Sequence, residues 1–387
     1  MKSIPSRIII IFLIISTFFV LSCSDDKITG SHNIPDVADT TVYNAVKFDS
    51  VHTLDIANYP NNTKLVIGNF NNTIAKALLK FRSLPDTTWL DTVQLQDCKI
   101  ELKKDTLYSD ESFDLEAYRL NENWDENTVT ADSLLNGETE LLATFYIEDS
   151  IVTIDIDTTL VRDWIVEDTL NFGLIIVPAE NCNENFVEFY SSESNFSPSM
   201  KITYMDSSGN SDTLSIHATD DTFISAWNQS PPFDTPVIAN LPPTEMVVKI
   251  ELTPDSLKLT EAEFQMIVIN RAEIIIDRDC ISTYYFSDDR IGIIPYSIID
   301  TTEFSIEYIS GCETTHYYAN RDSLFIDISG ILQGYTRGEI EGLQIAVRFT
   351  TFNKDFSFIE FADTTTPKLK IIYTSPILAD KQKGTKL

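Results

Sequence analysis

Short stretches in which apolar and polar residues alternate dominate the chain beyond residue 60. Clusters of Asn, Asp, Pro and Ser separate these stretches, which include Thr63–Ile67, Lys76–Phe81, Val93–Leu102, Val152–Ile156, Phe186–Tyr190 and Met200–Tyr204. Because successive side chains on a strand point to opposite faces, this pattern is typical of half-buried β-strands. Leu160–Val166 instead has apolar residues at helical spacing after Asp157. The pattern predicts an all-β fold with one short helical segment.

Four short motifs occur twice in the same order. Offsets of 169 to 172 residues relate Val152–Ile156 to Leu324–Ile328, Gly173–Val177 to Gly342–Val347, Phe186–Phe189 to Phe358–Phe361, and Ser197–Tyr204 to Thr366–Tyr373. This near-constant offset favours two tandem domains of one kind over two unrelated β domains. With the polar segment 206–211 as boundary, we predict jelly-roll-like β-sandwiches over residues 42–205 and 212–374, the second one divergent, and a polar tail over 375–387.

The N-terminus has the layout of a lipoprotein signal peptide. Lys2 and Arg7 precede the apolar run Ile8–Val20, and Leu21-Ser22 then precede Cys23. The apolar run is too short for a membrane span of about 20 residues. We therefore predict a signal peptide over residues 1–22, a lipid on Cys23 and a flexible tether over residues 23–41. An ordinary secretory signal is the alternative.

The residues after Cys23 bear on the location of the mature protein. Ser24-Asp25-Asp26 resembles the acidic export signal of Bacteroidota surface lipoproteins. This resemblance implies an outer-membrane lipoprotein exposed at the cell surface, and the membrane is then a partner through the lipid anchor.

The charge of the chain restricts its partners. The 59 acidic residues outweigh the 28 basic residues, for a formal net charge of −31. Such a surface repels nucleic acid and other polyanions, so no nucleic-acid partner is expected. A polyanionic ligand would need a local basic patch or bridging cations.

Four cysteines remain once Cys23 carries lipid. Two fall in each predicted domain, which suggests disulfides between Cys98 and Cys182 and between Cys280 and Cys312. Other pairings, or four buried free thiols, are the alternatives. No cysteine or histidine cluster has convincing zinc spacing, so we expect no metal site of that kind.

The first predicted domain resembles the DNRLRE domain family. The resemblance covers most of that domain and only the last third of the second, and its motifs are Leu65–Gly68, Ala77–Phe81, Tyr118–Thr130, Val152–Ile156, Val161–Trp164, Asn171–Leu174 and Phe189–Glu193. That family comprises extracellular β-sandwiches and includes carbohydrate-binding modules associated with alginate and other polysaccharides. The resemblance therefore implies a glycan-binding sandwich.

Enzymatic chemistry finds no support in the motifs. The four histidines form no HExxH array, and the chain has no GxSxG elbow or phosphate-binding glycine loop. We therefore predict that the protein is not an enzyme. No cofactor is expected either, although the acidic pairs Asp220-Asp221 and Asp155/Asp157 offer oxygen ligands for a structural calcium ion, with solvated charge as the alternative.

Aromatic residues in polar segments are the candidate ligand contacts, because sugar rings stack on aromatic faces. Trp124 and Trp227 lie in such segments, and Tyr118 and Arg119 precede Trp124. Burial of each tryptophan under a loop is the alternative. We predict a lipid-anchored, non-catalytic polysaccharide-binding protein. The alternative function is a structural or assembly component of an envelope complex that acts through protein–protein contacts.

Overall fold

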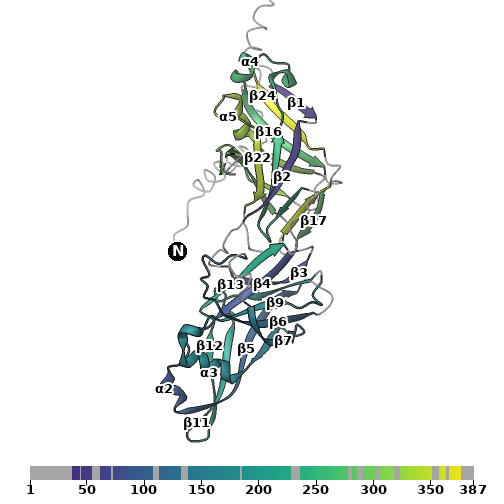
Figure 1. Cartoon of the computed structure of the whole chain (residues 1–387). Helices are drawn as coiled ribbons and strands as arrows, with labels where there is room; N and C mark the ends of the chain where they lie inside the picture. The colour runs from purple at the N-terminus through teal and green to yellow at the C-terminus, as the bar shows by residue number, and fades with distance from the viewer. Residues whose placement is uncertain are drawn as a thin grey trace, which may run out of the picture.

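The structure has two lobes arranged end to end (Figure 1). The computed structural model describes residues 37–43, 45–54, 62–70, 73–107, 113–131, 138–183, 185–227, 236–277, 281–285, 291–300, 305–317, 323–350, 357–362 and 366–375. Lobe one contains the strands between residues 64 and 227. Lobe two contains the strands between residues 37 and 53 and those between residues 237 and 374. Cys23 and the predicted signal peptide lie outside the described residues.

Lobe one is a curled antiparallel sheet of eleven strands. Its order is β12-β11-β5-β10-β3-β4-β9-β6-β7, with β13 beside β4 and β8 beside β5. The strands are β3 (Lys64–Phe70), β4 (Thr73–Lys80), β5 (Val93–Leu107), β6 (Asp114–Leu120), β7 (Glu138–Tyr146), β8 (Ile151–Ile156), β9 (Leu174–Pro178), β10 (Asn185–Tyr190), β11 (Ser199–Asp206), β12 (Ser211–His217) and β13 (Asp220–Trp227). The short helices are α2 (Thr87–Leu90), α3 (Thr158–Val166) and η3 (Asp168–Leu170).

The core of lobe one follows from the alternating pattern. In β8, Val152, Ile154 and Ile156 are buried while the residues between them are exposed. The predicted helical segment is confirmed as α3, whose first turn is capped because Thr159 N donates to Asp157 Oδ1 at 2.7 Å. Trp164 of this helix is 1% exposed and packs in the core of lobe one.

Lobe two packs a four-stranded sheet on a nine-stranded sheet. The smaller sheet has the order β1-β24-β16-β21, and the larger has β17-β23-β14-β15-β22-β18-β19 with β2 beside β15 and β20 beside β18. The strands are β1 (Val37–Tyr43), β2 (Val46–Thr53), β14 (Val237–Ala239), β15 (Thr244–Ile250), β16 (Val268–Asp277), β17 (Ile281–Tyr285), β18 (Ile291–Asp300), β19 (Ser305–Glu307), β20 (Thr315–Tyr317), β21 (Ser323–Asp327), β22 (Gln344–Phe349), β23 (Ser357–Phe361) and β24 (Lys368–Thr374). The short helices are η4 (Pro254–Leu257), α4 (Glu261–Met266) and α5 (Ser329–Thr336). The all-β sandwich fold predicted from the sequence is thus confirmed.

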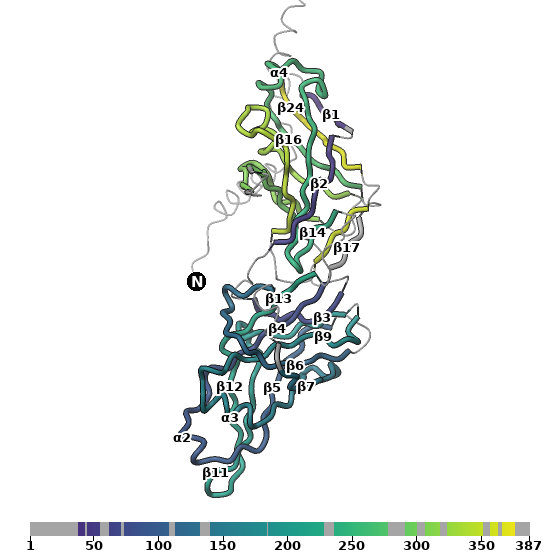
Figure 2. The backbone as a smooth tube through the Cα atoms, in the orientation of Figure 1, coloured from purple at the N-terminus to yellow at the C-terminus, as the bar shows by residue number. Residues whose placement is uncertain are grey.

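Strand pairing revises the predicted domain limits of 42–205 and 212–374. β1 and β2 pair with β24 and β15, so residues 37–53 complete lobe two (Figure 2). β12 and β13 pair with β11 and β4, so residues 211–227 complete lobe one. The physical reason is that an edge strand is stabilised by whichever sheet satisfies its backbone hydrogen bonds. Lobe one is therefore inserted between the two chain segments that build lobe two.

The two exchanged strand pairs occupy equivalent places. β12 lies beside β11 as β1 lies beside β24, and β13 lies beside β4 as β2 lies beside β15. The agreement extends to side chains, because Lys201 faces Ser215 in lobe one and Lys370 faces Thr41 in lobe two. In sequence, β1 and β2 directly precede β3 of lobe one but complete lobe two. Likewise, β12 and β13 directly precede β14 of lobe two but complete lobe one.

The lobes are in direct contact. Trp227, at the end of β13, donates its Nε1–H to Thr53 Oγ1 at 3.0 Å. Its ring also packs edge-on against Phe358 of lobe two, with 6.5 Å between ring centroids. Val237 and Leu241 of lobe two belong to the same apolar cluster as the core of lobe one. This continuity favours a fixed relation between the lobes over free hinging.

In the described part of the chain, no helix combines the length and apolar character that a bilayer crossing requires.

Candidate functional site

An aromatic and basic surface lies on lobe one where β3, β10 and β5 run side by side. We call it the Tyr190–Phe196 surface and define it by Lys64, Lys103, Asp105, Tyr190 and Phe196. The rings of Tyr190 and Phe196 have centroids 5.0 Å apart and are tilted by 54°. Lys103 Nζ lies 3.1 Å from the Phe196 centroid and 5.7 Å from that of Tyr190. Phe196 is 46% exposed, so part of its side chain reaches solvent beside the Lys103 ammonium group.

The local sequence explains why these side chains meet. Tyr190 ends β10, directly opposite Lys64 on β3. Phe196 follows in a turn rich in serine, where Ser194 Oγ donates to Ser191 O at 2.8 Å and accepts from Phe196 N at 3.0 Å. Hydroxyl-to-backbone bonds of this kind stabilise turns. The turn therefore holds Phe196 beside the last residue of the strand.

A charged network supports the aromatic pair. Lys64 Nζ lies 2.5 Å from Glu188 Oε2 and 3.0 Å from Asp105 Oδ2. Burial opposes the charged form of Lys64, but the hydrogen bonds and charges of Glu188 and Asp105 outweigh it and raise its pKa. Burial also opposes ionisation of Asp105, yet hydrogen bonds from Tyr190 and Lys64 hold its pKa below the usual value. The hydrogen bond to Asp105 raises the pKa of Tyr190, so its hydroxyl stays protonated and fixed.

The groups on this surface are of the kind that recognise a sugar. Aromatic faces stack on the C–H faces of sugar rings, and lysine ammonium groups donate hydrogen bonds to hydroxyls or carboxylates. The ammonium group of Lys103 lies over the aromatic pair on a chain whose net charge is −31, whereas that of Lys64 is paired with Glu188 and Asp105 and that of Lys104 donates to Glu148 O at 3.2 Å. Lys103 places a positive charge beside the rings, where it can pair with a carboxylate of an anionic sugar.

Trp124 does not lie on an exposed face, which corrects its sequence-based placement as a ligand contact. It is 4% exposed and packs with Leu78, Leu120 and Ile175. Its Nε1–H donates to Phe172 O at 2.8 Å. Because the polar residues around it turn outward while the indole fills a small apolar cluster, no face of the ring is available for stacking.

Tyr118 and Arg119 lie on β6, partly buried, and not beside the Tyr190–Phe196 surface in the strand order. The Tyr118 hydroxyl donates to Glu116 Oε2 at 2.8 Å, and its ring packs against the cluster of Trp124. Trp227 joins the two lobes, as described above, so its indole serves an internal contact. The structure therefore does not gather the four predicted ligand residues into one site.

The predicted disulfide between Cys98 and Cys182 is not formed. Both are buried free thiols, and Cys312 is a third. Cys280 lies outside the described residues. Burial raises the pKa of Cys98 to about 12 and that of Cys182 to about 11, so both thiols are unreactive at neutral pH.

The acidic pairs considered for calcium have other partners. Asp220 Oδ2 lies 2.5 Å from Arg82 Nε, and Asp221 accepts from Ser192 N at 2.7 Å. Asp157 caps α3. Over the residues described, no three His, Cys, Asp or Glu side chains are placed to hold a metal ion together.

Sequence reasoning missed the residues of the Tyr190–Phe196 surface. The sequence pattern gives Tyr190 only a place in a predicted strand and in a family motif, and it assigns no role to Phe196 or Lys103. One signal was present, because Phe196 is an isolated aromatic residue within the polar segment Ser191–Ser197. The approach of Lys103, 93 positions earlier, depends on strand pairing that the local pattern does not reveal.

Comparison with known proteins adds the class of the domain. Residues 33–204 match the model of carbohydrate-binding module family 96. The match supports a carbohydrate-binding domain of β-sandwich type in this part of the chain. It spans the Tyr190–Phe196 surface as well as β1 and β2, which pair into lobe two.

Two further comparisons add nothing to this class. None of the curated proteins matches the chain. Among solved structures, a chain in the cryo-EM structure of T=1 Penaeus vannamei nodavirus aligns over 88% of this chain and 98% of its own, with 9% identity and a TM-score of 0.14. That similarity is too low to bear on fold or function.

Proposed function

We propose that the protein is a lipid-anchored, non-catalytic glycan-binding protein that holds polysaccharide on the Tyr190–Phe196 surface of lobe one. The observation that carries the proposal is the exposed Phe196 ring beside the partly buried Tyr190 and under Lys103, in the part of the chain that matches a carbohydrate-binding module family. Modules of such families typically bind without catalysis. The ammonium group of Lys103 beside the rings favours glycans that carry carboxylates, such as polyuronates.

The arrangement of the lobes supports display of this surface away from an anchor. β1 and β24, the first and last described strands, pair with each other in lobe two. Lobe one forms the opposite end of the molecule (Figure 1). With lipid on Cys23 as proposed, the tether would join lobe two and lobe one would face outward. We place the protein in the outer membrane, at the cell surface, on the strength of the leader and the Ser24-Asp25-Asp26 motif.

Affinity electrophoresis in native gels tests the binding proposal. The mature chain from Ser24 is run through gels with a soluble polyuronate, a neutral polysaccharide or no polymer. We expect retardation by the polyuronate, with a dissociation constant at least about tenfold weaker in Phe196→Ala and in Lys103→Ala. The matched control is Leu141→Ala, because Leu141 is 50% exposed on β7, at the far edge of the same sheet.

Each outcome is decisive. Retardation that Phe196→Ala abolishes and Leu141→Ala leaves intact supports the proposal. Absence of retardation by every polymer, or equal weakening by both variants, contradicts it. Recovery of one defined envelope protein by crosslinking in native membranes, together with no polymer binding, would favour the assembly role instead.

A further inference from the structure

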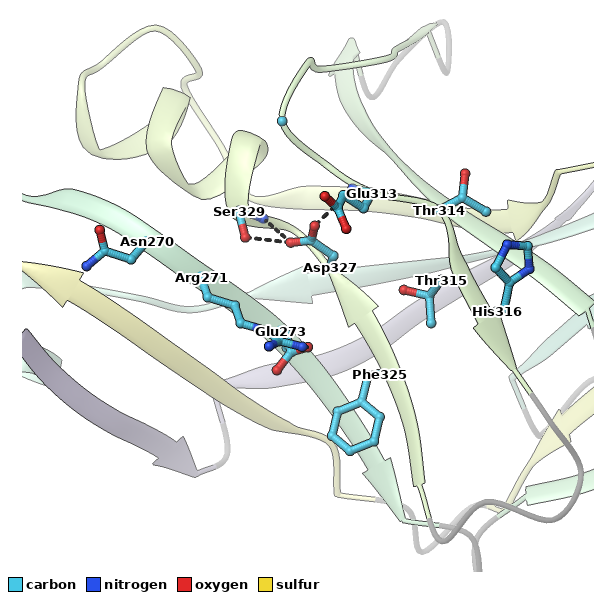
Figure 3. A pocket seen from close by; sticks show the side chains of 11 residues that line it. Asn270, Arg271, Glu273, Glu313, Thr314, Thr315, His316, Phe325, Asp327 and Ser329 are labelled. Atoms are coloured by element: carbon cyan, nitrogen blue, oxygen red, sulfur yellow. Dashed lines mark hydrogen bonds and ion pairs between the residues drawn. The ribbon is translucent and has the colours of Figure 1, made fainter. Parts of the chain in front are cut away.

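A hollow of about 710 Å³ opens on lobe two between β16, β21 and β20 (Figure 3). It is remote in sequence from the region that matches the carbohydrate-binding family. Volumes of roughly 300–1,000 Å³ are usual for small-ligand sites in proteins. The hollow therefore has room for a small saccharide.

The walls of the hollow are fixed by one carboxylate. Asp327, on β21, accepts hydrogen bonds from Glu313 N at 2.9 Å and from Ser329 N at 2.9 Å. Ser329 Oγ in turn accepts from Ala272 N of β16 at 2.9 Å. These bonds tie the loop before β20, the start of α5 and β16 to one another. A site whose walls are held in advance loses less entropy on binding.

The lining combines an aromatic ring with directional polar groups. Phe325 lies on β21 at one end of the hollow, partly exposed, while Thr315 and His316 approach from β20 (Figure 3). On the opposite side, Arg271 Nη2 lies 2.5 Å from Oε1 of Glu273, a side chain whose residue is only 7% exposed. A saccharide site needs an aromatic ring that stacks on the C–H face of the sugar, together with hydrogen-bond donors and acceptors for the sugar hydroxyls.

The charge of the lining selects among saccharides. Three carboxylates, those of Glu273, Glu313 and Asp327, stand against the single guanidinium of Arg271. An anionic sugar would therefore be repelled, in contrast to the lysine-bearing surface of lobe one. We propose that this hollow is a second saccharide site, specific for neutral sugars, so that the two lobes bind chemically different glycans. The proposal extends the proposed glycan-binding function of lobe one.

Isothermal titration of the mature chain with neutral gluco-, manno- and xylo-oligosaccharides tests the second site. We expect at least one of these to bind, with affinity reduced at least about fivefold in Phe325→Ala and in His316→Ala. Met266→Ala is the matched control, because Met266 is 47% exposed on α4 of the same lobe and does not line the hollow. Phe196→Ala, in lobe one, is titrated in parallel.

The failures of the two sites are distinguishable. Neutral binding that is weakened by Phe325→Ala and His316→Ala but unchanged in Phe196→Ala and Met266→Ala supports the second site. Neutral binding lost in Phe196→Ala, or unaffected by Phe325→Ala, overturns it, as does the absence of binding to all three oligosaccharide classes. Polyuronate retardation, measured separately, decides the function of lobe one whatever the result here.

Discussion

Glu245 is a fully buried carboxylate, and its removal should change how stability depends on pH. It lies on β15 with 0% exposure, and neither of its oxygens has a hydrogen-bond partner. Nη1 of Arg348, on the neighbouring strand β22, lies 3.9 Å from Glu245 Oε2. On the other side, His52 of β2 stands directly opposite in the register. Burial raises the pKa of Glu245 from 4.5 to about 7, against the opposing charge of Arg348.

The direction of the effect follows from the raised pKa. In the unfolded chain Glu245 ionises near pH 4.5, whereas in the folded chain it keeps its proton until about pH 7. Its contribution to stability is therefore complete below pH 4.5 and is lost as the pH rises through 7. A pKa gap of this size corresponds to about 3 kcal/mol, most of it lost between about pH 5 and 8.

Glu245→Gln removes this titration while preserving the shape of the side chain. We expect the variant and the original protein to have similar free energies of unfolding at pH 5. At pH 8 the variant should be more stable by about 2–3 kcal/mol, because the amide cannot ionise. Urea unfolding followed by circular dichroism at pH 5, 6.5 and 8 measures the difference.

The control is Glu251→Gln, which makes the same chemical change just after the same strand at a half-exposed position. Glu251 pairs with Lys47 at 2.7 Å, and the hydrogen bond from Lys47 lowers the pKa of Glu251. Because the Glu251→Gln variant still contains Glu245, its free energy of unfolding should still fall between pH 5 and 8. If the curves of Glu245→Gln and the original protein ran parallel across this range, the reasoning would be refuted.

Three further outcomes test the fold and the site. Trp124→Ala should lower the free energy of unfolding by about 3–5 kcal/mol in urea titrations, yet leave polyuronate retardation intact at low temperature, because the indole is core and not ligand contact. Gly173→Ala should cost about 2 kcal/mol or more, measured in the same way, because its φ is +81° and a Cβ would lie 2.1 Å from Leu79 O. Cys98 and Cys182 should resist alkylation in the native protein and react in urea, as peptide mass spectrometry can show; a disulfide-linked peptide of the two would contradict the free thiols.

The predicted strands 93–102, 152–156, 186–190 and 200–204 fall within β5, β8, β10 and β11. They could be predicted because period-two alternation needs only neighbouring residues and a sheet with one buried face. The site was harder to predict. A tryptophan in a polar segment has the same local pattern whether its ring faces solvent or core, and the buried hydrogen bond from Trp124 to Phe172 decides between the two.

The amino-acid sequence by itself determined the all-β class, the capped helix α3 and the strong negative charge. Only the tertiary structure decided which strands complete which lobe. The strands β1 and β2 precede β3 of lobe one, and the strands β12 and β13 precede β14 of lobe two. The order of these strands along the chain therefore does not assign either pair to a lobe. β12 joins lobe one through a hairpin with β11, whereas the placement of β13, β1 and β2 rests on backbone hydrogen bonds between residues more than 130 positions apart, in the pairs β13 with β4, β1 with β24 and β2 with β15. Such long-range pairing leaves no trace in local periodicity.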